Sequence, residues 1–296
     1  MPCPRRTRAG MLTDNENQQD PGQGPQGVGY VPDNCISLIC LTILTIRSNK
    51  TVKFYEFLGM SLLKKLSFPD AKFDLYFLGY DAPGAVSHGA NLWDREGLIE
   101  LTHNYGTESD ANYKVNNGNT EPHRGFGHTC ISVDNLQAAC QRLEEAGYKF
   151  QKKLSDGRMK HIAFALDPDG YWVEIIGRKP VEETAEEKET DLKTYRMNHT
   201  MLRVKDAEKS LSFYQEVLGM KLVRTHEAKE AGFNLYFLGY GDEKQNTADR
   251  EGLLELTWNY GTEKDEGFSY HNGNDQPQGF GHICEFLSSP RVPEGG

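Results

Sequence analysis

The chain carries several motifs twice, and this internal duplication constrains its fold more than any other feature. FDLYFLGY begins at Phe73 and returns as FNLYFLGY at Phe233. DREGLIELTHNYGTE at 94–108 returns as DREGLLELTWNYGTE at 249–263, and the GFGH at 125–128 returns at 279–282. The copies are offset by about 155 to 160 residues, and repeats on this scale are units that build one architecture together. We therefore expect two related copies with equivalent positions.

Length and composition restrict the class of protein. A chain of 296 residues can hold two domains, each with its own core. The net charge of −10 argues against nucleic acid as the main partner. The six cysteines show no CxxC and no regular spacing, which is typical of a reducing cytoplasm. The longest apolar run, at 36–46, is shorter than the roughly 20 residues that cross a membrane. We expect a cytoplasmic protein that binds neither membrane nor nucleic acid.

The chain divides into four segments by composition. Residues 1–34 are rich in Gly, Pro, Gln, Asn and Asp and are predicted to form a disordered tail, because they cannot bury enough apolar surface. Residues 35–178 form the first copy and 195–296 the second. The glutamate-rich segment 179–194 between them is predicted to be a charged, solvated linker with some helix.

Local patterns predict short helices among strands. Residues 50–60 and 209–220 have helical apolar spacing that ends at a glycine. Residues 134–150 are expected to form a helix that is capped by Asp134 and stopped by Gly147. The DPDG sequence within 160–176 predicts a hairpin. Each copy therefore contains two units with the order strand, helix and about three strands, which we call units 1 to 4.

Each copy also carries a glutamate and a histidine at similar spacing. Glu100 precedes His128 by 28 positions, and Glu255 precedes His282 by 27. Carboxylates and imidazoles on repeated strands are typical of divalent metal sites.

Five motifs, in one order, resemble the glyoxalase I (lactoylglutathione lyase) family of the vicinal oxygen chelate superfamily. The resemblance covers roughly residues 50–285, and the doubled form is similar to the fungal monomeric enzyme. It implies an α+β fold of βαβββ modules paired into curved mixed sheets, with units 2 and 3 paired, units 1 and 4 paired, and the first and last units incomplete. It also implies a monomer with an internal pseudo-dimer. The motifs are RGFGH (124–128), DPDGYWVEI (167–175), NHTMLRVKD (198–206), FYQEVLGM (213–220) and LELTWNYGTE (254–263).

The resemblance implies one complete metal site and one damaged one. The complete site combines His128 and Glu174 from unit 2 with His199 and Glu255 from unit 3. In the damaged site, Cys40 stands at the position equivalent to His199, in a sequence unlike NHTMLRVKD, so we do not expect it to act as a substitute ligand. The end of the chain, EFLSSPRVPEGG, replaces the expected helix and hairpin of unit 4. The residues left in this degenerate second site are Glu100, Asn104 and His282.

The implied reaction isomerises the hemithioacetal of methylglyoxal and glutathione to S-lactoylglutathione through a metal-stabilised enediolate. Glu174 would accept and return the proton, and Glu255 would serve the opposite face. One divalent metal is expected, zinc foremost, with nickel or cobalt open. Glutathione is the implied co-substrate. The family positions that would bind it are Arg124, Lys152, Arg158, Arg203 and Asn259.

The sequence leaves three alternative functions open. A ligand-sequestering protein of the same fold would bind without metal chemistry. An extradiol-type dioxygenase would use iron with two histidines and one glutamate, which the fourth candidate ligand disfavours. An inactive, truncated product would follow if unit 1, lacking its partner unit, exposed apolar surface and a strand edge.

Overall fold

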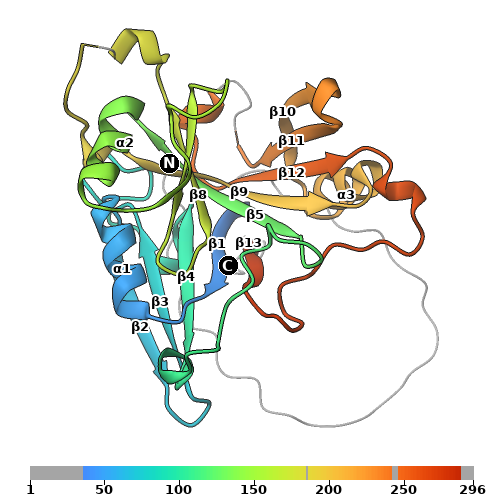
Figure 1. The fold of residues 1–296 in the computed structure, drawn as a ribbon, viewed down its shortest axis with the longest axis horizontal. Coiled ribbons are helices and arrows are strands. Elements are labelled where there is room, and N and C mark those ends of the chain that lie inside the picture. The colour runs from blue at the N-terminus through green and yellow to red at the C-terminus, as the bar shows by residue number, and fades with distance from the viewer. Residues whose placement is uncertain (1–35, 185, 242–245, 288–296) are drawn as a thin grey trace, which may run out of the picture.

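A computed structural model describes residues 36–184, 186–241 and 246–287 (Figure 1). The tail expected at 1–34 lies outside the described residues. Two sheets dominate the fold, one of eight strands and one of five. The fold class that the family resemblance implies, α+β with βαβββ units in paired sheets, is confirmed.

The eight-stranded sheet joins unit 2 to unit 3 in the order β10-β11-β12-β9-β5-β8-β7-β6. The two units meet at β5 and β9, which run antiparallel, whereas each of these strands runs parallel to the last strand of its own unit. Unit 2 comprises β5 (Phe126–Val133), α2 (Leu136–Glu145), β6 (Phe150–Lys152), β7 (Ile162–Leu166) and β8 (Trp172–Gly177). Unit 3 comprises β9 (Arg196–Val204), α3 (Ala207–Ser212), β10 (Lys221–Ala228), β11 (Phe233–Gly239) and β12 (Leu253–Asn259). The expected pairing of units 2 and 3 is therefore confirmed.

The five-stranded sheet contains unit 1 and the described part of unit 4, in the order β13-β1-β4-β3-β2. Unit 1 has all five elements, so the expectation that it is incomplete is wrong for its secondary structure. The apolar, β-branched sequence at 36–44 still has strand propensity although it departs from the family motif. The elements are β1 (Ile36–Leu44), α1 (Ser48–Phe57), β2 (Ser61–Phe68), β3 (Phe73–Gly79), β4 (Leu98–Asn104) and β13 (Phe280–Leu287).

The helix of unit 3 differs from its counterpart in unit 1 by one inserted residue. FYEFLGM at 54–60 corresponds to FYQEVLGM at 213–220. After α3 the backbone continues as a single π-helical turn, η5 (Phe213–Val217). A π turn accommodates one extra residue within a helix, so the insertion explains the change of helix type.

The described part of segment 179–194, predicted to be a charged linker, is mostly exposed but makes specific contacts with unit 2. It contains two 3₁₀ turns, η3 (Val181–Thr184) and η4 (Leu192–Thr194), and Thr184 is buried. It also binds the start of α2: the Asn135 amide donates to the backbone carbonyls of Glu187 and Glu189. The remaining 3₁₀ turns are η1 (Leu92–Asp94), η2 (Thr107–Ser109), η6 (Lys229–Ala231), η7 (Thr247–Asp249) and η8 (Thr262–Lys264).

The cap of α2 is Asn135, not Asp134 as predicted. The Asn135 side chain accepts a hydrogen bond from the backbone N–H of Ala138. Asp134 instead accepts hydrogen bonds from the Thr190 hydroxyl and the Asp191 backbone N–H. The linker therefore binds the carboxylate that the local pattern assigned to the helix.

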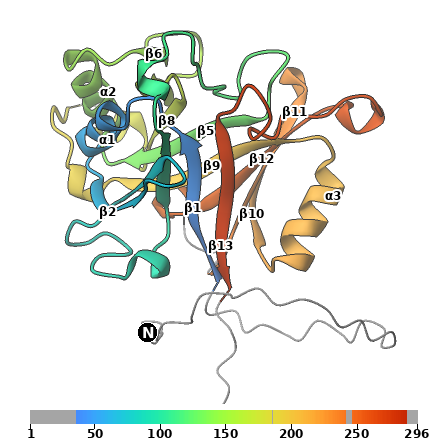
Figure 2. The same cartoon turned by 90° about the horizontal axis from the view of Figure 1, so that it is seen from below.

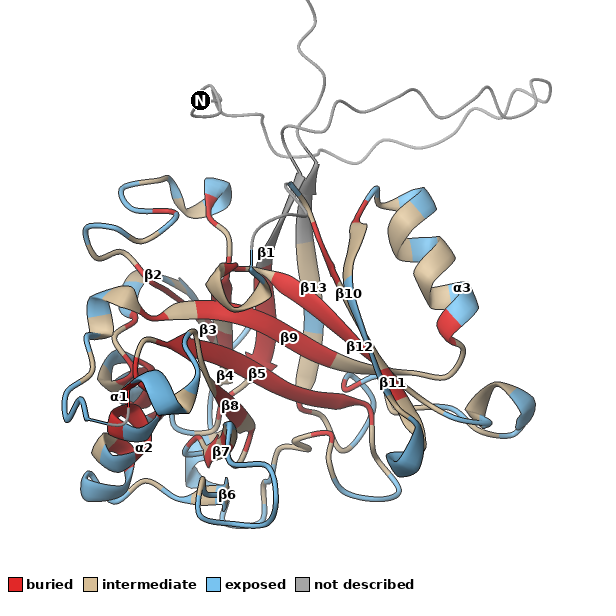
Figure 3. Cartoon of the chain, turned by 90° about the horizontal axis from the view of Figure 1, so that it is seen from above, coloured by how far each residue is buried: buried red, intermediate tan, exposed pale blue. Residues whose placement is uncertain are grey.

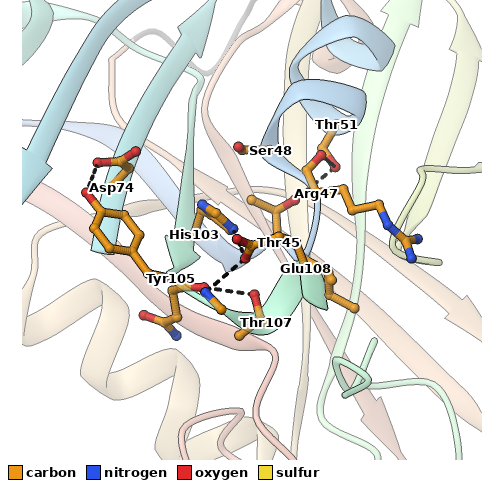
Figure 4. A network of polar contacts seen from close by, with 12 residues as sticks. Thr45, Arg47, Ser48, Thr51, Asp74, His103, Tyr105, Thr107 and Glu108 are labelled. Carbon is orange, nitrogen blue, oxygen red and sulfur yellow. Dashed lines mark hydrogen bonds and ion pairs between the residues drawn. The ribbon is translucent and has the colours of Figure 1, made fainter. Parts of the chain in front are cut away.

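The two copies preserve equivalent local contacts. In unit 1 the Tyr105 hydroxyl donates to Asp74 Oδ1 at 2.6 Å (Figure 4), and in unit 3 the Tyr260 hydroxyl donates to Asn234 Oδ1 at 2.6 Å. An equivalent contact is kept even where the residue differs, because Trp258 stands at the position of His103. The His103 ring contacts Glu108 at 3.1 Å, and the Trp258 ring donates to Glu263 at 3.1 Å. The repeats share their contacts as well as their sequence.

The main core lies between units 1 and 2. Phe54 and Tyr55 of α1 and Leu143 of α2 are fully buried in it, and the Phe54 ring meets the Tyr148 ring edge-on at 5.0 Å. Figure 2 shows α1 and α2 on one side of the molecule and α3 on the other. Figure 3 shows β5 and β9 as buried along most of their length. Units 1 and 2 thus share a core, whereas units 2 and 3 share a sheet.

Candidate metal centre

Four neighbouring strands of the eight-stranded sheet each contribute one side chain to a single cluster. His128 lies on β5, Glu174 on β8, His199 on β9 and Glu255 on β12. Their ligand atoms all lie within 4.8 Å of one another. Among the residues that the structure describes, no other three His, Cys, Asp or Glu side chains come together in this way.

The distances within the cluster suit a shared cation. The Nε2 atoms of His128 and His199 are 3.3 Å apart. Glu174 Oε2 lies 3.4 Å from the first Nε2 and 3.2 Å from the second, and Glu255 Oε2 lies 2.9 Å from His199 Nε2 and 3.9 Å from His128 Nε2. Ligands about 2.0–2.2 Å from one ion lie roughly 3–3.5 Å apart at ordinary coordination angles. The side chains already have the spacing of a coordination shell.

All four side chains are buried, and their charges affect one another. Burial by itself would raise the pKa of Glu174, but His128 and then His199 outweigh it and hold that pKa well below the usual value. Burial would lower the pKa of His199, but Cys130 and the two glutamates raise it well above the usual value. The Glu174 carboxylate is thus kept ionised beside the imidazoles, and an ionised carboxylate is the form that binds a cation.

Two contacts of His199 could not be found in the sequence motifs. The ring Nδ1 lies 2.8 Å from Oδ1 of Asn198, its neighbour in the chain. The ring also interacts with Cys130, which stands opposite His199 across β5 and β9, and burial raises the pKa of the Cys130 thiol.

The cluster lies in a cavity of about 650 Å³, within the range of small-molecule sites. Aromatic rings form part of its wall: the Phe164 ring packs against the His128 ring at 5.3 Å, and the Phe237 ring packs against the His199 ring at 5.4 Å. Val181 of η3 and Thr247 of η7 also line the cavity, so it includes part of the segment expected to be a linker. The arrangement places four ionisable groups in a partly aromatic pocket.

Three of the five predicted substrate-binding residues line this cavity: Arg124, Arg203 and Asn259. The Arg203 guanidinium donates to the backbone carbonyls of Gly118 and Phe126, at 3.0 and 2.8 Å. Arg203 therefore holds the loop before β5 through hydrogen bonds, and it also lines the cavity.

Lys152 and Arg158 are not among the described residues that line the cavity. The Lys152 ammonium donates to the carbonyls of Met159 and Ile162, at 2.6 and 2.9 Å. It thereby supports the loop that carries Met159 and His161 to the cavity. Arg158 is exposed on the same loop.

The residues of the degenerate second site lie on the five-stranded sheet. Thr42 of β1 stands in register with Glu100 of β4 and with His282 of β13, and its hydroxyl lies 3.2 Å from His282 Nε2. Asn104 ends β4, where its carbonyl accepts a hydrogen bond from Thr107. Glu100 and His282 therefore flank one strand without a described third ligand beside them.

Sequence and structure comparisons identify the class to which this fold and site belong. The sequence pattern of the Glyoxalase/Bleomycin resistance protein/Dioxygenase superfamily matches residues 37–175 and 196–288. Glyoxalase I of Saccharomyces cerevisiae is 52% identical over 240 residues, covering 79% of this chain and 73% of the relative. Lactoylglutathione lyase of Schizosaccharomyces pombe is 50% identical over 238 residues, covering 80% and 76%. The crystal structure of glyoxalase I from Zea mays, 30% identical, superposes with a TM-score of 0.61 and covers 84% of this chain and 74% of that one.

The chain therefore belongs to the glyoxalase I (lactoylglutathione lyase) family. No helix in the described part of the chain has the length and hydrophobicity to cross a membrane.

Proposed function

We propose that the chain isomerises the hemithioacetal of methylglyoxal and glutathione to S-lactoylglutathione, as a lactoylglutathione lyase with one active site. The observation that supports this most directly is the cluster of His128, Glu174, His199 and Glu255 on four adjacent strands. The cluster needs unit 2 from one copy and unit 3 from the other. The names of the relatives and the chemistry of the cavity agree with this activity.

The residues fit a divalent metal. Two imidazole nitrogens and two carboxylate oxygens form a donor set that suits zinc, with nickel and cobalt as rivals. When bound, the ion would supply a Lewis acid for the negative charge that develops on the substrate oxygens. The protein contributes the spacing of the ligands, between 2.9 and 3.9 Å for the measured histidine–glutamate pairs.

We propose that the two glutamates transfer the substrate proton. The reaction removes a proton from the carbon beside the thioether sulfur and returns one to the neighbouring carbon. Glu174 and Glu255 enter the cluster from β8 and β12, on either side of the paired histidine strands β5 and β9. We assign proton transfer to Glu174 and the opposite face of the substrate to Glu255. A well-placed base of this kind contributes about 10²–10⁴-fold to the rate.

The glutathione part of the substrate is proposed to lie against the basic and amide groups of the cavity. Arg124 and Arg203 offer guanidinium groups, and Asn259 offers an amide that also donates to the Tyr270 hydroxyl at 2.7 Å. Lys152 and Arg158 are proposed to contribute through the loop that they support or occupy. Guanidinium groups suit the two carboxylates of glutathione because they donate paired hydrogen bonds.

A single chain supplies every proposed ligand, so we infer a monomer with an internal pseudo-dimer. A cytoplasmic location is proposed from the cysteines: Cys40, Cys130, Cys140 and Cys284 are all free thiols. Light scattering of the purified protein tests the monomer.

The activity is tested by thioester formation from methylglyoxal and glutathione. Chelator-treated protein should be inactive, and addition of zinc, nickel or cobalt should restore turnover. Metal-loaded protein that binds the adduct without converting it would instead support a ligand-binding role. Oxygen uptake with a catechol would support the dioxygenase alternative, which the four-residue cluster already disfavours.

A further inference from the structure

Asn198 and His199 are consecutive residues of β9 and both are buried, with 2% and 3% of their surface exposed. Neighbouring side chains on a strand point to opposite faces of the sheet. Asn198 nevertheless places Oδ1 2.8 Å from Nδ1 of the imidazole, on the ring edge away from the cluster.

Two backbone carbonyls fix the orientation of the Asn198 amide. Its Nδ2 lies 2.7 Å from the Thr247 carbonyl and 2.9 Å from the Arg250 carbonyl. Carbonyl oxygens accept hydrogen bonds and never donate them, so the atom that faces both must be the NH₂ group. Both amide hydrogens are thereby used, and the atom that faces His199 must be the amide oxygen.

An amide oxygen can only accept a hydrogen bond, so Nδ1 of His199 must carry a proton. In a neutral imidazole, a proton on Nδ1 leaves the lone pair on Nε2. Nε2 is the atom that lies 2.9 Å from Glu255 Oε2 and 3.3 Å from His128 Nε2, at the centre of the cluster. The amide therefore selects the tautomer whose lone pair points at the metal centre.

We propose that Asn198 is a positioning residue whose acceptor oxygen fixes the tautomer and ring orientation of His199 for metal binding. In the native chain the segment 247–250 binds the amide nitrogen. The same segment lines the cavity through Thr247 and Ala248. Asn198 thus links the cavity wall to a ligand of the metal. This inference rests on the proposed metal site, although not on the identity of the substrate.

The test compares two substitutions that separate the roles of the two amide atoms. Asn198→Leu removes the acceptor, and we expect it to weaken zinc binding about 10- to 100-fold, as loss of a group that orients a ligand typically does. Asn198→Asp keeps an acceptor for the Nδ1 proton but loses both donors to the carbonyls. We expect it to retain zinc affinity within about threefold of wild type. Affinity is measured by competition with a chelating dye.

Asn234→Leu is the matched control. Asn234 is a buried asparagine of β11 in the same sheet, and its hydrogen bonds go to Tyr236 and Tyr260. This substitution should lower thermal stability and leave zinc affinity unchanged. A loss of affinity equal to that of Asn198→Leu would show that any buried asparagine matters, and would overturn the proposal.

A second measurement reports on the imidazole itself. Nitrogen NMR of the zinc-loaded protein, with ¹⁵N-labelled histidine, should show a protonated Nδ1 at His199 in wild type and in Asn198→Asp. Zinc-loaded wild type with an unprotonated Nδ1 would overturn the proposal. If Asn198→Leu does not fold, the Asp variant decides: it must keep both the affinity and the Nδ1 signal.

The outcomes distinguish this inference from the proposed function. Wild-type protein that binds no zinc, nickel or cobalt would contradict the metal site and with it both proposals. Wild-type protein that binds zinc, with Asn198→Leu binding as tightly, would contradict only the role of Asn198. Wild-type protein that binds zinc without isomerase activity would contradict the proposed reaction and leave Asn198 as a positioning residue.

Discussion

Cys40 on β1 occupies the register position that His199 occupies on β9. Cys40 pairs with Leu98 on β4, and His199 pairs with Leu253, the repeat of Leu98, on β12. Burial, and after it the charge of Glu100, raises the pKa of the Cys40 thiol well above its usual value. A protonated thiol is a poor metal ligand, because the thiolate is the form that binds. The five-stranded sheet therefore preserves the frame of a metal site without its first ligand.

We predict one tightly bound divalent ion per chain. Glu100→Gln and His282→Ala should leave the stoichiometry at one, because those residues have no described third ligand beside them. His128→Ala should lower it towards zero. Elemental analysis after desalting measures the ratio, and a ratio near two that falls on substitution of His282 would show that the second site is intact.

Glu174 and Glu100 should differ in their effect on turnover. Glu174→Gln removes the proposed base and should lower kcat about 10²–10⁴-fold. Glu100→Gln lies on the other sheet and should leave kcat unchanged. Steady-state kinetics with metal-saturated variants make the comparison. Near-normal turnover by Glu174→Gln would contradict its proposed role, since metal saturation removes weak binding as an explanation.

Two repeated phenylalanines should differ in their effect on stability. Phe54 is fully buried between units 1 and 2, whereas Phe213, its counterpart on η5, is 48% exposed. Phe54→Ala should lower the free energy of unfolding by about 3–5 kcal/mol, the usual cost of removing a buried ring. Phe213→Ala should cost less than about 1 kcal/mol. Urea denaturation measures both, and equal losses would contradict the packing described for α1.

The contribution of Asp167 to the stability of the chain should fall as pH rises above the acidic range. Burial, and after it the neighbouring Asp169, raises the pKa of Asp167 from 3.8 to about 8. Below about pH 4 both the folded and unfolded states hold the proton. Between about pH 4 and 8 the unfolded chain releases it and the folded chain keeps it, so unfolding becomes easier by up to about 1.4 kcal/mol per pH unit.

Asp167→Asn tests this pH dependence, because it keeps the oxygen that accepts from the backbone N–H groups of Asp169 and Tyr171. The difference in unfolding free energy between wild type and the variant should shift in favour of the variant from pH 4 to pH 8. A difference that stays constant over that range would show that Asp167 does not retain its proton in the folded state.

Much of the site could be predicted because its ligands lie in ordered motifs on repeated strands. The GFGH and WVEI motifs predicted His128 and Glu174 as ligands, and the family resemblance implied that their partners come from the other copy. The contact between Asn198 and His199 could not be predicted in this way. Strand alternation predicts that these residues point to opposite faces, but the β5–β9 register shifts at Asn198, and the amide is oriented by carbonyls about fifty residues away in sequence.

Local sequence patterns predicted the structure less well where tertiary contacts determine the local conformation. Asp134 is a good helix cap by residue type, but the linker uses its carboxylate and leaves the cap to Asn135. The helical spacing at 209–220 predicted an ordinary α-helix, whereas the structure has the π turn η5. The one extra residue in this repeat is the sequence feature that corresponds to the π turn.

A crystal structure of the zinc-loaded protein, with the ion located by anomalous scattering, tests the central claim most directly. We predict one strong peak about 2.0–2.2 Å from a nitrogen of His128 and His199 and an oxygen of Glu174 and Glu255. A peak beside Glu100 and His282 alone, or four side chains too far apart to share any ion, would contradict a metal centre built across the two copies.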